Sequence, residues 1–153
     1  MADLAKLKQL REETGVSFSL CKKALEETNG DLNAAKKKLQ EWGETKAGEK
    51  STRTTSQGGI FSYVHHNRKV AAFVELQTET DFVSGNDEFK KLGQEIAMQA
   101  ASVPAENIEG LLEQEYIRDP SKKINDLIKA AVLKFGENIK LARFTRWSLG
   151  GEG

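Results

Sequence analysis

The sequence predicts an α+β fold in two parts. The first observation is a series of helical spacings within residues 1–43, where apolar side chains recur every three or four positions. The second is a pair of apolar, aromatic-rich segments at 60–65 and 69–78, which is typical of an antiparallel hairpin. The third is the stretch 44–59, whose single apolar residue is Ala47 and which is typical of a linker. We therefore expect a three-helix module at 1–43, a linker at 44–59, and a core at 60–150 with a three-stranded antiparallel sheet and packed helices.

The three expected helices of the N-terminal module are separated by residues that stop helices. Gly15 is suited to a left-handed cap after the first helix, and Asn29-Gly30 breaks the chain after the second. Asp31 is a good N-cap for the third helix, which we expect to end at Gly43. The side chains expected to face inward are Leu4, Leu7 and Leu10 in the first helix, Cys21, Ala24 and Leu25 in the second, and Leu32, Ala35, Leu39 and Trp42 in the third. Because about 43 residues bury little apolar surface, this module should be only marginally stable alone.

Three segments of the core have the composition of β-strands. Residues 60–65 and 69–78 are joined by His66-Asn67-Arg68, which we interpret as a tight turn. Residues 139–149 return to strand character further along the chain. A sheet of three strands leaves two edges and often one face exposed, so we expect this sheet to associate with another chain.

Two helices are expected to cover the sheet. The first should run from its cap Asp87 to Ser102, where Val103-Pro104 ends it. The second should run from Ser121 to Gly136. Their apolar stripes are Phe89, Leu92, Ile96, Ala97 and Ala100 in the first helix and Ile124, Leu127, Ile128, Ala131 and Phe135 in the second. Residues 105–119 are ambiguous and allow a short helix.

Composition excludes several classes of protein. The 23 basic and 23 acidic residues give a net charge of zero, which argues against a dedicated nucleic-acid binder. The longest apolar run, Val70–Val74, has five residues, so we expect neither a transmembrane helix nor a signal peptide. Cys21 is the single cysteine, which rules out a disulfide framework and fits a reducing, cytoplasmic compartment.

The residues that most often carry chemistry do not form a catalytic pattern. Cys21 lies on the inward side of its expected helix, as a small buried apolar residue does. His65 and His66 are the only histidines, too few for a metal site, and consecutive strand residues point to opposite faces. We expect one of the two rings to be packed and the other to be in water, and one of them to contact a partner. Gly58-Gly59 has no phosphate-loop pattern and no paired carboxylates stand out, so we expect neither an enzyme nor a cofactor.

The segment Thr80-Asp81-Phe82-Val83 is different, because it places a phenylalanine in a polar stretch between a strand and a helix. Two interpretations are open. Phe82 either folds back as a cap on the core or is presented, beside the carboxylate of Asp81, to a protein partner.

Four motifs, in order and spacing, resemble the bacterial elongation factor Ts family. Residues Leu10–Gly15 read Leu-Arg-Glu-Glu-Thr-Gly, and Cys21–Leu25 read Cys-Lys-Lys-Ala-Leu. Thr80–Val83 is similar to the most specific motif of the family. Gly136–Ile139, followed by Arg143, is similar to its C-terminal strand signature. The resemblance covers nearly the whole chain.

The resemblance implies a fold and a mechanism. The N-terminal helices would form a ubiquitin-associated-like module that docks on the GTP-binding domain of elongation factor Tu. Phe82 would act there as a wedge and Asp81 as its polar partner, framed by Thr80 and Val83, so that the Mg²⁺ and phosphate site of the partner is disturbed and GDP leaves. The partner-binding candidates are Lys22, Lys23, His65 and His66. No covalent chemistry is implied.

Two departures from the family pattern suggest further expectations. Val16–Leu20 stands where the family usually has Ala-Gly-Met-Met-Asp, in the region of the N-terminal contact. The chain also has room for one core half where longer relatives have two, so we expect a homodimer through the sheet.

An alternative function is a ubiquitin-associated-like adaptor that binds a protein without exchange activity and tolerates Phe82→Ala. A small enzyme that uses His65 or His66 is a third hypothesis.

Overall fold

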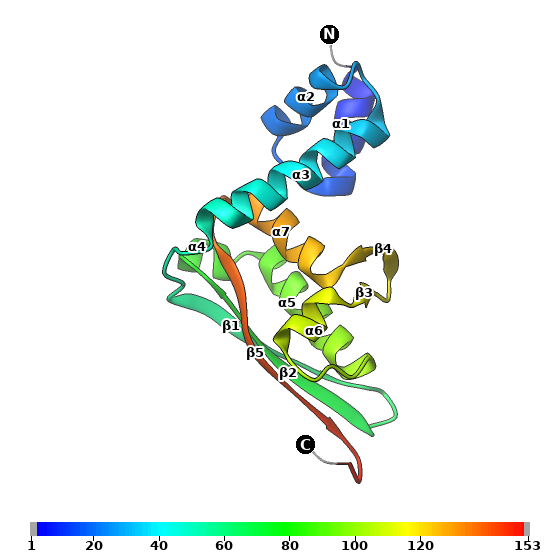
Figure 1. The fold of residues 1–153 in the computed structure, drawn as a ribbon, viewed down its shortest axis with the longest axis vertical. Helices are drawn as coiled ribbons and strands as arrows, with labels where there is room; N and C mark the ends of the chain where they lie inside the picture. Colours follow the sequence, from blue (N-terminus) through cyan, green and yellow to red (C-terminus); the bar gives the residue numbers. More distant parts are fainter. Residues whose placement is uncertain (1–2, 152–153) are drawn as a thin grey trace.

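The computed structural model describes residues 3–151, which form an N-terminal group of helices and a mixed core (Figure 1). The predicted α+β class and the three-stranded antiparallel sheet are confirmed. Along the chain the elements are α1 (Leu4–Thr14), α2 (Phe18–Glu27), α3 (Leu32–Lys50), β1 (Gln57–Val64), β2 (Val70–Thr78), α4 (Asp81–Ser84), α5 (Asp87–Ser102), α6 (Ile108–Glu113), β3 (Glu115–Tyr116), β4 (Asp119–Lys123), α7 (Ile124–Phe135) and β5 (Ile139–Ser148).

The ends of α1 and α2 and the start of α3 lie where the sequence predicts. Gly15 has the left-handed conformation (φ 69°) after α1, and its N–H donates to the carbonyl of Arg11. The Asp31 side chain caps α3 by accepting a hydrogen bond from the N–H of Ala34 (3.2 Å). Of the predicted inward side chains, Leu7, Leu10, Cys21, Ala24, Leu25, Ala35 and Leu39 are buried together. The prediction for Leu4 is wrong, because it is the first residue of α1 and is 74% exposed.

The predicted end of the third helix at Gly43 is also wrong, because α3 continues to Lys50. Gly43 is buried where α3 crosses α7, and a Cβ atom there would lie 3.1 Å from the carbonyl oxygen of Lys129. The absence of a side chain at Gly43 therefore permits α3 and α7 to pack closely, and the residue does not end the helix. Ala47, one turn further on, packs against the core. The boundaries of independent domains stay a prediction.

The sheet has the strand order β1–β2–β5, with both pairs antiparallel. The predicted turn between β1 and β2 is confirmed: the N–H of His65 donates to the carbonyl of Val70, and Arg68 has a positive φ of 60°. A bulge in β5 leaves Ala142 unpaired between two partners of β2. It keeps Leu141 and Phe144, which lie on either side of the bulge, on the inner face.

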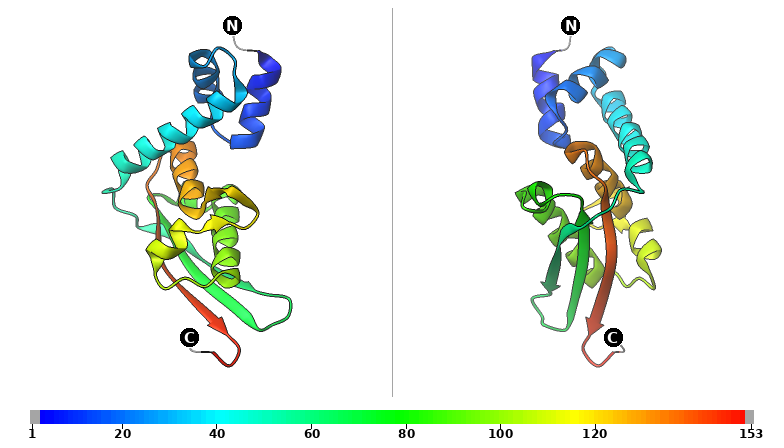
Figure 2. Two further views of the ribbon diagram at one scale, coloured as in Figure 1. Left: turned by 45° about the vertical axis from the view of Figure 1, so that its right-hand side comes forward. Right: turned by 90° about the vertical axis from the view of Figure 1, so that its left-hand side faces the viewer.

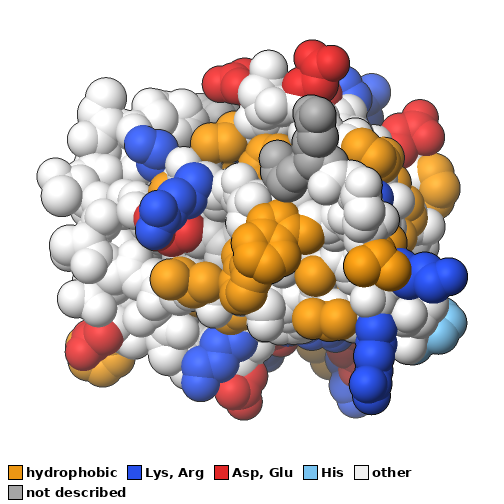
Figure 3. Space-filling model, turned by 90° about the horizontal axis from the view of Figure 1, so that it is seen from below, with side chains coloured by type: hydrophobic (Ala, Val, Ile, Leu, Met, Phe, Trp, Pro, Cys, Tyr) orange, Lys and Arg blue, Asp and Glu red, His pale blue; other side chains and the backbone are white. Residues whose placement is uncertain are grey.

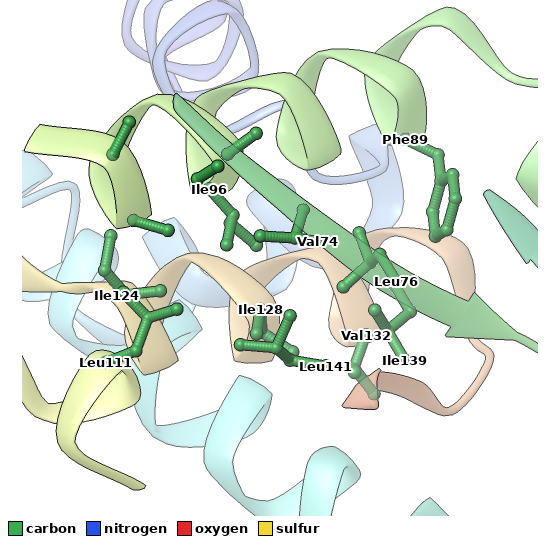
Figure 4. Packing of buried hydrophobic residues seen from close by; sticks show 14 of the residues in the cluster. Val74, Leu76, Phe89, Ile96, Leu111, Ile124, Ile128, Val132, Ile139 and Leu141 are labelled. Atoms are coloured by element: carbon green, nitrogen blue, oxygen red, sulfur yellow. The ribbon is translucent and has the colours of Figure 1, made fainter. Parts of the chain in front are cut away.

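One face of the sheet carries the main hydrophobic core. Helices α5, α6 and α7 lie on this face, as the two turned views show (Figure 2). Side chains from β2, α5, α7 and β5 interlock there (Figure 4). The largest buried contributors are Val74, Leu76, Phe89, Ile96, Leu111, Ile124 and Val132.

The starts of the two core helices differ from the prediction by a few residues. Asn86, not Asp87, caps α5, because its side chain accepts a hydrogen bond from the N–H of Glu88 (2.8 Å). Helix α7 begins at Ile124, not Ser121, because the residues before it pair with β3 as strand β4. This small ribbon has no alternating apolar pattern in the sequence, whereas the short helix allowed within 105–119 is present as α6. Within residues 3–151, no helix combines the length and apolar character needed to cross a membrane.

Gly93 gives a first test of this packing. Its added Cβ would lie 2.2 Å from the ring of Phe61, which is itself held edge-on against Phe89. We expect Gly93→Ala to lower the free energy of unfolding by about 1–3 kcal/mol, as measured by urea denaturation. Gly48→Ala in α3 is the matched control, since its Cβ would meet no atom within 4 Å. It should stabilise the helix by up to about 1 kcal/mol, and equal effects at both positions would contradict the packing argument.

Candidate functional site: the Phe82 turn

The Phe82 turn consists of Thr80 and the short helix α4, between β2 and α5. Thr80 is extended (φ −124°, ψ 160°) and starts the helix. Val83 is buried in the core, whereas Phe82 is 87% exposed, the largest exposed fraction among the large hydrophobic side chains of the described residues. Phe82 therefore does not fold back as a cap on the core. Buried Val83 anchors the turn, and the aromatic ring stands in solvent next to the exposed Asp81.

The base of the turn is held by one carboxylate, that of Glu137, which lies between α7 and β5. Its Oε1 atom accepts hydrogen bonds from the backbone N–H groups of Thr80 (3.0 Å) and Glu79 (3.2 Å) and from the hydroxyl of Thr78 (2.9 Å). Its Oε2 atom accepts a fourth bond from the hydroxyl of Thr80 (2.6 Å). One side chain thus fixes three consecutive residues that lead into the turn.

The charge of Glu137 is stabilised by these contacts. Partial burial alone would raise the pKa of the carboxyl, but the hydrogen bonds from Thr80, Thr78 and Glu79 outweigh it and lower the pKa below its ordinary value. Glu137 is therefore ionised at neutral pH and accepts all four bonds at once.

A second carboxylate, that of Glu79, ties the same region to the segment after α3. It accepts a hydrogen bond from the N–H of Asn138 and forms an ion pair with Arg53 (3.5 Å). The side-chain amide of Asn138 donates in turn to the carbonyl of Arg53 (2.9 Å). Three separate stretches of chain therefore meet at the base of the Phe82 turn.

In the sequence, Glu137 stands out only as a member of the Gly136–Ile139 motif. Its one local signal is position, because it directly follows a helix-ending glycine and precedes a strand. The partners of its carboxylate are nearly sixty residues away along the chain, so no local pattern points to them.

The two histidines lie at the other end of β1, beyond its last residue Val64. Because they lie in the turn, strand alternation does not separate them, and the expectation of opposite faces is wrong: their ring centroids are 4.1 Å apart. His65 is half-buried, with its Nδ1 atom 2.9 Å from the hydroxyl of Tyr63, whereas His66 is exposed, as expected. No group of three or more metal-ligating side chains occurs among residues 3–151.

The other predicted contact residues, Lys22 and Lys23, are exposed on α2. The ammonium group of Lys23 lies 5.2 Å from the centroid of the Trp42 ring. Figure 1 shows α2, α4 and the β1–β2 turn at separate levels of the molecule. The structure therefore does not gather the predicted residues into one pocket. They lie at separate places along the molecule.

The face of the sheet opposite the helices, here called the outer face, is apolar near the β1–β2 turn. Strand alternation and register place Ile60, Val64, Ala71, Phe73 and Trp147 on it. Trp147 is 61% exposed. Figure 3 views the molecule from the end where the hairpin and the C-terminus lie, and hydrophobic side chains gather there. An exposed apolar cluster of this kind is typical of an interaction surface.

Comparison with known proteins places these features in a family. A family model described as Elongation factor TS matches residues 79–152, which include the Phe82 turn and Glu137. An elongation factor Ts of Coprothermobacter proteolyticus is 42% identical over 94% of this chain and 96% of its own length. That of Thermosipho melanesiensis is 38% identical with the same coverage, and that of Clostridium acetobutylicum is 43% identical over 97% of this chain and 48% of its own length.

The first of these matches extends over 189 positions, whereas this chain has 153 residues, so that relative contains residues without a counterpart here. The identity nevertheless covers almost the whole chain, from the N-terminal helices to the last strand. This chain belongs to the elongation factor Ts family.

Proposed function

We propose that the protein is a guanine-nucleotide exchange factor that binds elongation factor Tu in its GDP form and promotes release of GDP. The observation that carries the proposal is the exposed ring of Phe82 on a turn whose base is fixed by Glu137. An apolar ring held rigidly in water favours insertion into a partner, because binding removes the ring from water and little conformational entropy is lost. Family membership supports the choice of partner.

The proposed mechanism needs no bond chemistry. GDP is held by Mg²⁺ and by backbone N–H groups around its phosphates. Insertion of Phe82, guided by Asp81 and framed by Thr80 and Val83, moves the segments that provide these contacts, and GDP dissociates. By linkage, GDP weakens the binding of this protein to elongation factor Tu by the same factor.

Lys22 and Lys23 on α2, together with His65 and His66 at the hairpin turn, are proposed to contribute docking contacts. Because these residues lie apart from the Phe82 turn, the two regions have different roles. Lys22, Lys23, His65 and His66 affect the affinity for the partner, whereas Phe82 affects the rate of GDP release from the bound partner. The proposed activity belongs to the cytoplasm, where translation takes place.

The test is stopped-flow release of a fluorescent GDP analogue from elongation factor Tu, with and without substoichiometric amounts of this protein. Accelerated release supports exchange activity. Binding of the same partner without any acceleration favours instead the adaptor function.

We further propose a homodimer through the outer face, which would bury Phe73 and Trp147 from both copies. Phe73→Glu places a charge in that contact and is expected to convert the dimer to a monomer at micromolar concentration, as measured by analytical ultracentrifugation. Ile117→Glu, at an exposed apolar residue between β3 and β4, is the matched control and should leave the dimer intact. A wild-type protein that sediments only as a monomer would contradict the dimer.

A further inference from the structure

The hydrogen bonds of Glu137 are concentrated on the residues that set the direction of the Phe82 turn. Two of its four donors are backbone N–H groups, those of Glu79 and Thr80, where β2 ends and α4 begins. Thr80 is extended, and its N–H and that of Glu79 both donate to the Oε1 atom of Glu137. Within the described residues, no other side chain accepts hydrogen bonds from this part of the turn.

Besides Glu137 and the Glu79 contacts described above, the turn has an apolar, nondirectional support. Val83 is buried against the core and fixes the depth of α4. Packing of one valine does not determine how α4 is rotated about this anchor, whereas four hydrogen bonds on one side do. The Glu137 carboxylate is therefore the directional contact at the base of the Phe82 turn.

We infer that Glu137 is a positioning residue for nucleotide exchange, which holds the Phe82 turn in the orientation that enters the partner. The inference rests on the proposed function and extends it to a residue that has no need to touch the partner. It requires Glu137 to act through Phe82, and this requirement separates a positioning role from a general contribution to folding.

The experiment is a double-mutant cycle on the maximal rate of GDP release at saturating factor. The proteins are wild type, Glu137→Ala, Phe82→Ala and the double variant, each also assayed for the concentration that gives half the maximal rate. We expect Glu137→Ala to lower the maximal rate about tenfold or more, because it leaves four donors without their acceptor. The half-saturating concentration should change far less, since docking by α2 and the hairpin turn is untouched.

The cycle distinguishes the two roles. If Glu137 acts through Phe82, its loss adds no further effect in the Phe82→Ala background. Equal reductions in both backgrounds, or an unchanged maximal rate in Glu137→Ala, would overturn the inference. If wild type accelerates release and Phe82→Ala does not, the proposed function stands whatever Glu137 does. If wild type itself fails to accelerate release, the function and this inference fall together.

Two further variants guard against misfolding and against a pure charge effect. Glu137→Gln keeps one acceptor oxygen for the backbone N–H groups and is expected to recover most of the rate, even if Glu137→Ala does not fold. A Gln variant as slow as the Ala variant would overturn the geometric explanation. Glu113→Ala removes an exposed carboxylate paired with Lys123 far from the turn, and it should leave both kinetic parameters unchanged.

Discussion

Phe82→Ala is expected to lower the maximal rate of GDP release by about 30- to 900-fold, which corresponds to about 2–4 kcal/mol. The reason is that the ring is the largest apolar group of the turn and is the group proposed to displace the Mg²⁺ and phosphate contacts of the partner. Docking through α2 and the hairpin turn should persist. The measurement is stopped-flow release of a fluorescent GDP analogue across a range of factor concentrations.

The same variant should leave folding unaffected, because a side chain that is 87% exposed contributes little to the core. An unchanged melting temperature therefore separates loss of the wedge from loss of structure. Ile117→Ala, which removes another exposed apolar side chain, is the matched control and should release GDP as fast as wild type. If Phe82→Ala keeps the full maximal rate, the wedge mechanism is excluded.

Phe89→Ala, unlike Phe82→Ala, should destabilise the fold. We expect it to lower the free energy of unfolding by about 3–5 kcal/mol. Phe89 is fully buried (0% exposed) at the start of α5, and its ring meets that of Phe61 edge-on, with centroids 6.2 Å apart. Its removal leaves a cavity between α5 and the inner face of the sheet. Chemical denaturation followed by circular dichroism measures the loss.

For a domain of this size such a loss is a large part of the total stability, which is about 5–15 kcal/mol. The comparison with Phe82→Ala is informative, since both substitutions remove a phenylalanine ring and only the burial differs. A destabilisation of Phe89→Ala below about 1 kcal/mol would mean that α5 repacks over the cavity.

The elements that could be predicted from the sequence are those whose signals are local. The β1–β2 hairpin follows from two apolar segments on either side of His66-Asn67-Arg68, and the ends of α1 and α7 follow from Gly15 and Gly136. The end of α3 could not be predicted, because Gly43 permits a close approach to Lys129, a contact between residues far apart in the chain. The β3–β4 ribbon was missed because its strands are short and mostly polar.

The candidate site also has features that local sequence signals predict and features that depend on long-range contacts. The position of the Phe82 turn is visible in the sequence, as a phenylalanine between a strand and a helix. Whether its ring is packed or exposed depends on tertiary structure, and so does the network of Glu137 at the base of the turn. The two histidine rings come together because β1 ends one residue earlier than the predicted strand, at Val64.

The continuous helix α3 has a geometric consequence for any partner that contacts both ends of the molecule. Its 19 residues span about 28 Å. Because each residue of an α-helix turns the chain by about 100° and advances it by about 1.5 Å, inserting one residue would rotate α1 and α2 around the core. Inserting seven residues would nearly restore the rotation while moving the two ends about 10 Å further apart. The length of α3 thus contributes to both the spacing and the relative direction of α1 and α2 and the Phe82 turn.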